Sequence, residues 1–357
     1  MTRTPSHLSS SEHSTSKDRP LIIPVFIPHG GCPHQCVFCD QKVITSEKHK
    51  IPSSADLRSR VSKFLTYTTR KKAVIQIAFY GGNFLGLHQT EITRLLNTAT
   101  EFVSGGLADS IRFSTRPDTV DPKRLELLTA YPVKTIELGV QSMDDDVLAM
   151  TRRGHTSAHT KKACAYLKER HYEIGLQMMF GLPGDDETRT LETGRRIADL
   201  CPDFVRIYPT VVLANSPLAQ WYQEGKYMPL SLEASIDLAK KLYLQFKERK
   251  IRVARMGLQA SEDLNNGAGV LAGPYHPAFG HLVLSRIFLD TATVILESRT
   301  EMPAKIMIKI HPRSVSKMLG QKRQNIEILK KKFFVQSIQI TPDPSLAEDQ
   351  LKIDGIE

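Results

Sequence analysis

The sequence contains little cysteine, only five in 357 residues, and the number is odd. No secretory signal is recognisable at its amino terminus. Both observations argue against a disulfide framework and favour a reducing compartment, so we expect a cytoplasmic protein. Two of the cysteines, Cys164 and Cys201, stand alone in helical patterns, and we expect both to be small buried residues.

Long apolar runs are missing as well, because none approaches the roughly eighteen residues of a membrane span. We therefore expect no membrane partner. The chain is 41% hydrophobic, and its length suits one large domain and one small one. The formal charge of +10 indicates an anionic partner without choosing one, and no feature indicates an oligomeric state. Residues 1–19 are rich in Ser and Thr, which predicts a disordered tail.

Three cysteines are concentrated in one short loop, GGCPHQCVFCDQ. Cys32, Cys36 and Cys39 have the spacing C-x3-C-x2-C. Three thiolates can bind three irons of a four-iron cluster, which takes four ligands, so that one iron stays open. The alternative is a structural zinc ion with His34 as the fourth ligand, although no second ligand pair follows downstream.

Strand-like apolar runs alternate with helical patterns up to about residue 211. The expected strands are residues 21–28, 73–80, 110–115, 133–139, 172–180 and 204–211. The expected helices are residues 55–69, 90–103, 122–129, 144–150, 157–170 and 187–200. This alternation predicts βαβ units with a parallel sheet, hence an α/β fold built as a partial (β/α)6 TIM-like barrel.

The unusual segments all follow expected strands. The cysteine loop follows the first strand, and FYGGNF, TRPD, GVQS and GLPG follow the next four. Right-handed crossovers place these strand ends on one face. In barrels that face builds the active site, so we expect the five segments to form one site.

These motifs make the sequence resemble the radical S-adenosylmethionine (SAM) superfamily. More narrowly, residues 21–259 are similar to the radical-SAM domain of the Elongator catalytic subunit and its shorter bacterial relatives. The motifs shared are GCPHQCVFC, FYGGNF, TRPD, IELGVQS, RRGHT, GLPG and VRIYPT. Oxygen-independent coproporphyrinogen oxidase shares the fold and several of these motifs.

The resemblance implies a radical SAM enzyme with two cofactors, a [4Fe-4S] cluster and SAM. In this family one electron from the reduced cluster cleaves SAM to methionine and a 5′-deoxyadenosyl radical, which abstracts hydrogen from the substrate. The cofactors carry this chemistry and the protein orients them. A flavodoxin- or ferredoxin-type protein would be the electron donor.

The resemblance also assigns residues. Cys32, Cys36 and Cys39 would bind the cluster, and Phe38 would lie near the adenine of SAM. The remaining SAM contacts would be Gly81 and Gly82 at its amino group, Arg153 at its carboxylate, and Gln141 and Gln177 at its ribose hydroxyls.

Several of these residues have plainer interpretations. Arg153 could be a solvated helix end, and the amide of Gln177 could bind a neighbouring backbone group instead of a ribose. Arg206 could point into the barrel mouth or form a structural ion pair. His155 is more often a capping or core histidine than a base. Tyr208 alternates with apolar neighbours, as Arg206 does.

The sequence departs from the family at two positions, Asn83 and Ser114. Many radical SAM enzymes carry a carboxylate after the paired glycines, where this chain has Asn83, and an acidic residue where Ser114 precedes TRPD. Each change removes a candidate anchor for SAM, although an amide or a hydroxyl still accepts a hydrogen bond. About a hundred residues follow residue 259, too few for the acetyltransferase domain with which Elongator modifies the wobble uridine of tRNA.

The carboxyl-terminal part is strongly basic. Residues 304–332 contain nine Lys or Arg and a single acid, Glu327. We expect a strand at 305–310, a helix at 314–331 and a strand at 334–340, forming a small α+β domain. The segment resembles the KH module, whose GxxG loop clamps RNA backbone. Gly320, Lys322 and Arg323 would contact RNA in that case, and a solvated basic face is the alternative.

We therefore expect a disordered tail at 1–19, a radical SAM core domain at 20–265 and a KH-like, RNA-binding domain at 266–357. The loop at 267–280 would link the two or lie over the barrel mouth. The expected substrate is RNA, with tRNA as the candidate. The alternatives are radical chemistry on a small molecule or tetrapyrrole, and a nucleic-acid-binding protein with a purely structural cluster.

Overall fold

The computed structural model describes residues 20–40, 44, 51–67, 74–259, 264 and 269–356, and the term described residues refers to these below. The expected tail at 1–19 lies outside them. So do the first residue of the expected strand 73–80, the last residues of the expected helix 55–69 and the start of the loop 267–280.

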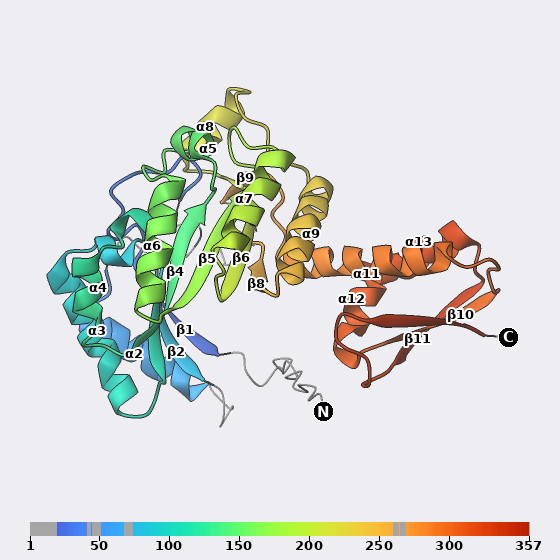
Figure 1. Cartoon of the computed structure of the whole chain (residues 1–357), viewed down its shortest axis with the longest axis horizontal. Helices are drawn as coiled ribbons and strands as arrows, with labels where there is room; N and C mark the ends of the chain where they lie inside the picture. The colour runs from blue at the N-terminus through green and yellow to red at the C-terminus, as the bar shows by residue number, and fades with distance from the viewer. Residues whose placement is uncertain are drawn as a thin grey trace, which may run out of the picture.

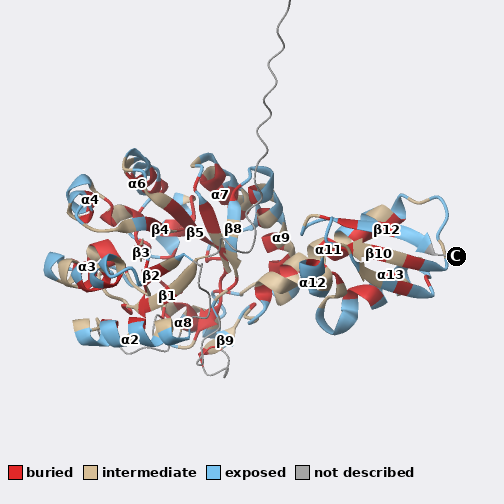
Figure 2. Cartoon of the chain, turned by 90° about the horizontal axis from the view of Figure 1, so that it is seen from below, coloured by how far each residue is buried: buried red, intermediate tan, exposed pale blue. Residues whose placement is uncertain are grey.

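A parallel sheet of seven strands forms the larger part of the molecule, in the order β1-β2-β3-β4-β5-β6-β8. The sheet curls into an arc with helices around its outer face, as Figure 2 shows. The expected partial TIM-like barrel is thereby confirmed. The strands are β1 (Leu21–Phe26), β2 (Ile75–Tyr80), β3 (Ser110–Thr115), β4 (Val133–Gln141), β5 (Glu173–Phe180), β6 (Phe204–Pro209) and β8 (Arg252–Met256).

Helices occupy the connections between successive strands (Figure 1). They are α2 (Ser54–Thr66), α3 (Gln89–Ser104), α4 (Pro122–Leu128), α5 (Asp145–Met150), α6 (Ser157–Glu169), α7 (Glu187–Asp199), α8 (Pro217–Gln223) and α9 (Leu232–Glu248). Their starts follow local chemistry, because Ser53 and Asp56 cap α2 reciprocally. Asp121 caps α4 with Pro122 at the first helical position, and Asp186 caps α7.

The main hydrophobic core lies between the outer face of the sheet and these helices. Six strands each contribute a fully buried residue to it: Ile23, Ile77, Phe113, Leu138, Leu176 and Ile207. Because successive side chains of a strand alternate between faces, the residues next to these point to the concave face of the sheet. The concave face is therefore where polar side chains of β2 to β8 gather.

The seventh strand, β8, was not predicted. It pairs with β6 in parallel at the edge of the sheet. Its sequence, RVARM, carries two arginines in five residues, and none of these residues is fully buried. A strand at the edge of a sheet pairs on one side only and can bury a single face, so its sequence contains few apolar residues by which to recognise it.

The carboxyl-terminal part has its own three-stranded sheet, in the order β11-β10-β12. β10 (Lys305–Ile310) pairs in parallel with β11 (Ser337–Pro342) and antiparallel with β12 (Leu351–Ile356). The single helix expected at 314–331 was wrong, since α12 (Val315–Leu319) and α13 (Gln324–Phe333) replace it. Gly320, Lys322 and Arg323 between them all have positive φ, which no continuous helix allows.

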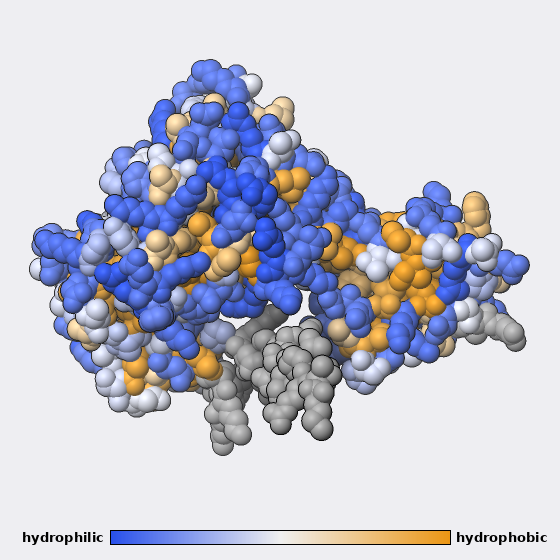
Figure 3. Space-filling model, viewed as in Figure 1, coloured by the Kyte–Doolittle hydropathy of each residue, from blue (hydrophilic) through white to orange (hydrophobic). Residues whose placement is uncertain are grey.

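One long helix, α11 (Phe279–Glu297), joins the two parts (Figure 1). Its first turns place Phe279 and Val283 in the main core, and its later turns place Phe288 and Leu296 in the core of the carboxyl-terminal part. In Figure 3 hydrophobic residues also show at the surface around α11 and α12. The domain boundary at 265/266 stays a prediction, because the helix that follows it belongs to both cores.

By length and composition alone, α11 is long and apolar enough to cross a membrane, the one such helix among the described residues. No apolar run of that size was expected from the sequence. Two of its charged residues are paired with α9, since Arg286 contacts Asp237 at 2.8 Å and Asp290 contacts Lys240 at 2.6 Å. These contacts are those of a helix packed inside a protein.

Within the loop at 267–280, the described residues form a short strand, β9 (Val270–Ala272). β9 pairs antiparallel with β7 (Val212–Leu213), which directly follows β6. This ribbon therefore lies next to the carboxyl end of β6, at the barrel mouth. α11 begins a few residues later.

Candidate functional site

The middle of the concave face is an ion-pair network around Glu137 of β4, which is fully buried. Arg112 Nη2 and Arg206 Nε each lie 2.6 Å from a Glu137 oxygen. The Tyr80 hydroxyl donates to Glu137 at 2.6 Å and Gln177 Nε2 donates at 3.1 Å. Burial raises the pKa of Glu137, but the charges of Arg206 and Arg112 outweigh it and hold the pKa at about 2. Glu137 is therefore ionised and links β4 to four other strands, β2, β3, β5 and β6.

This network decides between the two interpretations of Arg206, which forms a structural ion pair. It also gives Gln177 side-chain partners, since Gln177 Nε2 lies 3.1 Å from Glu137 and 3.4 Å from Ser114 Oγ. Glu137, Arg112 and Tyr80 were not among the residues singled out from the sequence. The available signal was a charged residue at the centre of the apolar strand VKTIELG.

The cysteine loop starts where β1 ends, and it packs backbone against backbone on the glycine pair after β2. Ile27 N donates to Tyr80 O at 2.8 Å and His29 N donates to Gly81 O at 2.9 Å. A Cβ added to Gly82 would lie 2.5 Å from Ile27 O and 2.6 Å from the carbonyl oxygen of Gly30. Glycine is needed at Gly82 because the chain itself fills this space.

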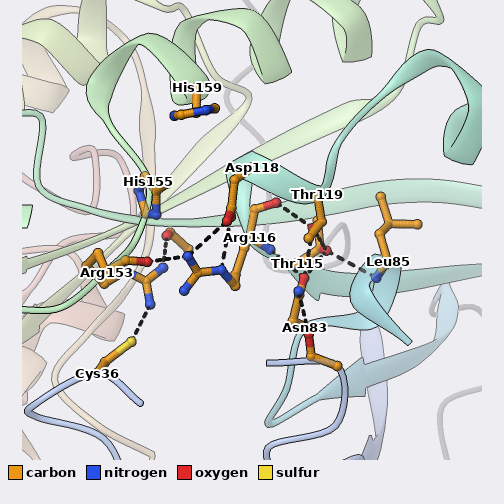
Figure 4. Close-up of polar contacts among 12 residues, drawn as sticks. Cys36, Asn83, Leu85, Thr115, Arg116, Asp118, Thr119, Arg153, His155 and His159 are labelled. Atoms are coloured by element: carbon orange, nitrogen blue, oxygen red, sulfur yellow. Dashed lines mark hydrogen bonds and ion pairs between the residues drawn. The ribbon is translucent and has the colours of Figure 1, made fainter. Parts of the chain in front are cut away.

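Asn83 joins three of the loops at the mouth (Figure 4). Its side chain is fully buried. Oδ1 accepts hydrogen bonds from Thr115 Oγ1 at 2.7 Å, from Thr119 Oγ1 at 2.8 Å and from Arg116 N at 3.0 Å. Nδ2 donates to Gly31 O at 2.8 Å, next to the first cysteine. The amide is thus committed within the protein, and only an amide could make both kinds of contact at this position.

Arg153 connects the cysteine loop to the strand ends (Figure 4). Its Nη1 lies 3.1 Å from Cys36 Sγ, and its Nη2 donates to Gly139 O at 2.5 Å. Its carbonyl oxygen accepts from Arg116, which also pairs with Asp118 at 2.9 Å. Arg153 is 6% exposed, so it is not a solvated helix end.

Four side chains at the mouth carry buried polar atoms that lack a hydrogen-bond partner among the described residues. These atoms are Arg116 Nη1, Gln141 Oε1, Arg153 Nε and His155 Nδ1. Gln141 has a positive φ of 66°. The pairing of β4 with β5 shifts its register between Gly139 and Gln141, so the strand is locally irregular at this residue. Buried polar groups are normally satisfied, so these atoms indicate a polar ligand.

Phe38 and His155 at the mouth are apolar and neutral, respectively. Phe38 is 8% exposed and lies in a small apolar cluster with Val147, Leu182 of the GLPG turn and Leu218. His155 is a core histidine, as expected, because its Nε2 lies 3.2 Å from Val140 O. Burial and the nearby arginines lower its pKa to about 3, so it is neutral at pH 7.

The cysteines differ in environment. Cys36 is buried, Cys39 is half-buried and Cys32 is exposed, and none of them forms a disulfide bond with a described residue. The described residues contain no set of three His, Cys, Asp or Glu side chains placed closely enough to hold a metal ion. Elsewhere, Cys164 is buried as expected, but Cys201 is exposed. The expectation for Cys201 was wrong because α7 ends at Asp199 and leaves it outside the helix.

By their donor chemistry the residues present fit a thiolate-bound cluster with a polar ligand beside it, although the three thiols are not gathered as closely as a single metal ion requires. Three soft sulfur donors lie in one loop, the donor type that iron–sulfur clusters use. The unpartnered guanidinium atoms of Arg153 and Arg116 lie next to that loop and suit a carboxylate.

Comparison with known proteins agrees with this arrangement. Residues 26–197 match the Radical SAM superfamily and residues 202–288 match the Radical_SAM C-terminal domain. The chain is 25% identical over 230 residues to the tRNA uridine(34) acetyltransferase of Dehalococcoides mccartyi, covering 56% of this chain and 50% of the relative. It is 27% identical over 188 residues to the Elongator complex protein 3 of Saccharomyces cerevisiae, covering 47% and 34%. The chain spans about half the length of the tRNA uridine(34) acetyltransferases that it matches.

A solved structure shows the same fold. The archaeal Methanocaldococcus infernus Elp3 with an N-terminal deletion matches with a TM-score of 0.62 at 20% identity, covering 77% of this chain and 64% of the other. Motifs, fold and family matches all agree. The chain belongs to the radical SAM superfamily and is a radical SAM enzyme, whose cofactors are a [4Fe-4S] cluster and SAM.

Proposed function

We propose that this radical SAM enzyme modifies RNA, with tRNA as the substrate. The observation that carries the proposal is that the cysteine loop and the unpartnered polar atoms of Arg153, Arg116 and Gln141 meet at one barrel mouth. The similarity to tRNA uridine(34) acetyltransferases supports the substrate class. Because the chain spans about half of those relatives, we do not transfer their acetyl transfer to it.

The roles of the site residues follow from their positions. Cys32, Cys36 and Cys39 would bind three irons of the cluster, which when bound supplies the electron that cleaves SAM. Arg153 would hold the SAM carboxylate through its free Nε. The Gln141 amide, with Oε1 unpartnered, would accept a hydrogen bond from a ribose hydroxyl.

Other residues at the mouth would shape the SAM site without such a contact. Phe38, in its apolar cluster, would exclude water on the adenine side. The Gly81 and Gly82 backbone would face the SAM amino group, while Gly82 also admits the cysteine loop. Gln177 would reach the ribose only by giving up its contact with Glu137 or Ser114.

The enzyme assignment is tested by anaerobic reconstitution with iron, sulfide, reductant and SAM. We expect the wild-type protein to bind about four irons and to form 5′-deoxyadenosine. Cys36→Ala should lose both, whereas Cys201→Ser, a matched change of an exposed cysteine outside the loop, should lose neither. If the cluster is loaded but no 5′-deoxyadenosine forms, the enzyme assignment fails, and the alternative is a nucleic-acid-binding protein with a structural cluster. Replacing chemical reductant by flavodoxin or ferredoxin tests the electron donor.

The carboxyl-terminal part would bind the RNA backbone. β10, α12, α13 and β11 form a strand–helix–helix–strand unit with GQKR at the helix–helix junction. Lys322 and Arg323 are exposed there, and neither side chain forms an ion pair or a hydrogen bond with any described residue. Arg323, which replaces the second glycine of GxxG, adopts the left-handed backbone at φ of 63° that glycine would favour. Gly320, with φ of 70°, begins the turn.

Crosslinking to tRNA tests this contact. The variant Lys322→Glu/Arg323→Glu should crosslink several-fold less than wild type, because it reverses two charges near the RNA phosphates. The control Lys161→Glu/Lys168→Glu makes the same charge change at exposed positions of α6. If the two variants crosslink equally, the GQKR segment is not part of the RNA interface. Nucleoside analysis of RNA from a deletion strain would then identify the modified nucleoside, and an unchanged RNA profile would favour a small-molecule or tetrapyrrole substrate.

A further inference from the structure

The wall of the barrel formed by β6 and β8 carries two adjacent arginines. Arg206 of β6 pairs in register with Arg255 of β8. The next pair along the two strands, Ile207 and Met256, belongs to the main core on the outer face. Since successive residues alternate between faces, Arg206 and Arg255 both point to the concave face. Tyr208 follows two residues later on β6 and shares that face.

The charges of the two arginines are balanced very differently. Arg206 is paired with Glu137, which it shares with Arg112. Arg255 is only partly exposed, yet its side chain forms no ion pair or hydrogen bond with any described residue. The other carboxylate of this face, Glu173, is bonded to Thr135 and lies 3.7 Å from Arg252. Among the described residues, the β8 side of the concave face therefore has a guanidinium without a carboxylate partner, and burying a charge costs free energy unless it is paired.

This charge lies away from the cysteine loop. The loop follows β1 at one edge of the sheet, and β8 is the opposite edge. Arg153, which contacts Cys36, belongs to the connection after β4. An anion bound at Arg255 would thus sit across the barrel from the cluster ligands, on the wall that a substrate entering the mouth would face.

We propose that Arg255, with Arg206 and Tyr208 beside it, binds a phosphate group of the RNA substrate next to the nucleotide that reacts. The inference rests on the proposed function and assigns the barrel wall that holds the RNA backbone. A guanidinium donates two parallel N–H groups to a phosphate, and a tyrosine hydroxyl can donate a third hydrogen bond. Phosphate contacts set the register of a nucleic acid without reading its sequence, which is the role that this position requires.

The test measures binding of an anticodon stem–loop RNA to anaerobically reconstituted holoenzyme over a series of KCl concentrations. The variants are Arg255→Gln, Arg255→Lys and, as the matched control, Arg124→Gln, an exposed arginine on the outer helix α4. Arg255→Gln should weaken binding about five- to tenfold and reduce the slope of log K against log salt by about one. Arg255→Lys keeps the charge and should lose less. Thermal unfolding checks that all variants remain folded.

A second measurement identifies the phosphate. RNAs that carry a single neutral methylphosphonate at successive linkages should show one linkage at which neutralisation weakens binding to wild type but has no further effect on Arg255→Gln. If every linkage behaves identically in the two proteins, or if Arg255→Gln binds like Arg124→Gln, the inference is wrong. If the wild-type holoenzyme forms no 5′-deoxyadenosine or does not bind the RNA, the proposed function is wrong, and the inference about Arg255 is wrong as well.

Discussion

The middle of the concave face and the mouth above it use similar residues in opposite ways. In the middle, Glu137 has four side-chain partners and is fully buried. At the mouth, Arg116, Gln141 and Arg153 have buried polar atoms without a partner among the described residues. A satisfied buried network stabilises the fold by itself, whereas unsatisfied buried atoms cost free energy until a ligand binds them. The comparison separates residues that build the barrel from residues that we propose as contacts of SAM.

The largest effect is expected when the charge of Glu137 is removed, because this change tests whether the buried network stabilises the barrel. Glu137→Gln leaves Arg112 and Arg206 buried without a counter-charge, so the free energy of unfolding should fall by about 3–5 kcal/mol. Glu101→Gln removes the carboxylate of an exposed ion pair with Arg58 and should cost far less, because water screens that pair. Chemical denaturation measures both. Equal losses in the two variants would show that the network does not stabilise the barrel.

Acid should weaken the middle of the barrel in a defined pH window. The folded pKa of Glu137, about 2, is below its ordinary value of 4.5. A lowered pKa contributes stability that is fully present above the unfolded pKa and is lost as pH falls through the folded one. The free energy of unfolding should therefore fall by roughly 3 kcal/mol between about pH 5 and pH 2 through this group. Glu137→Gln should lack this component, and an identical pH dependence of the two proteins would contradict the assignment.

At the mouth the expected effect is on ligand binding more than on stability. Arg153→Gln should weaken SAM binding about ten- to a hundredfold, since it removes a charge-assisted hydrogen bond of about 1.5–3 kcal/mol. Arg153→Lys should not restore it fully, because an ammonium cannot reproduce the fork. Isothermal titration of SAM into reconstituted protein, together with the EPR spectrum of the reduced cluster with and without SAM, measures the loss. If Arg153→Gln binds SAM as tightly as wild type, the role of Arg153 is structural.

Asn83 differs from the other polar residues at the mouth, because its side-chain oxygen and nitrogen both have hydrogen-bond partners within the protein. Asn83→Asp would place an acceptor against Gly31 O and should destabilise the protein by about 1–3 kcal/mol. If Asn83 positions the cysteine loop, iron content should fall as well, beyond what a comparably destabilising Ile77→Val change in the core produces. Full iron loading and normal SAM affinity in Asn83→Asp would limit Asn83 to a general structural role.

The site could be predicted as far as local chemistry reaches. The cysteine spacing and the loops after each strand were visible in the sequence, because parallel strands place their carboxyl ends on one face. The partners of Gln177 and Arg206 were not visible, because Glu137 and Tyr80 come from other strands and meet them only when the sheet curls. The same reason hid the contact between Arg153 and Cys36, which are 117 residues apart.

Two differences in the elements have local causes. The helix expected at 314–331 has apolar residues at helical spacing before and after GQKR, but the left-handed backbone at Lys322 and Arg323 divides it. β8 is too polar to be recognised as a strand, and only its pairing with β6 makes it one. That pairing in turn places Arg255 beside Arg206.

By itself the sequence determined the alternation of strands and helices, the cysteine triad and its resemblance to radical SAM enzymes, because these depend on spacing along the chain. Only the tertiary structure decided which polar residues are used internally and which stay free. Hydrogen bonds and ion pairs form between side chains brought together from distant strands, and burial decides whether an unpaired group costs free energy. For that reason Glu137 and Asn83 belong to the architecture, while Arg153, Gln141 and Arg255 have polar groups to which we assign ligands as a proposal.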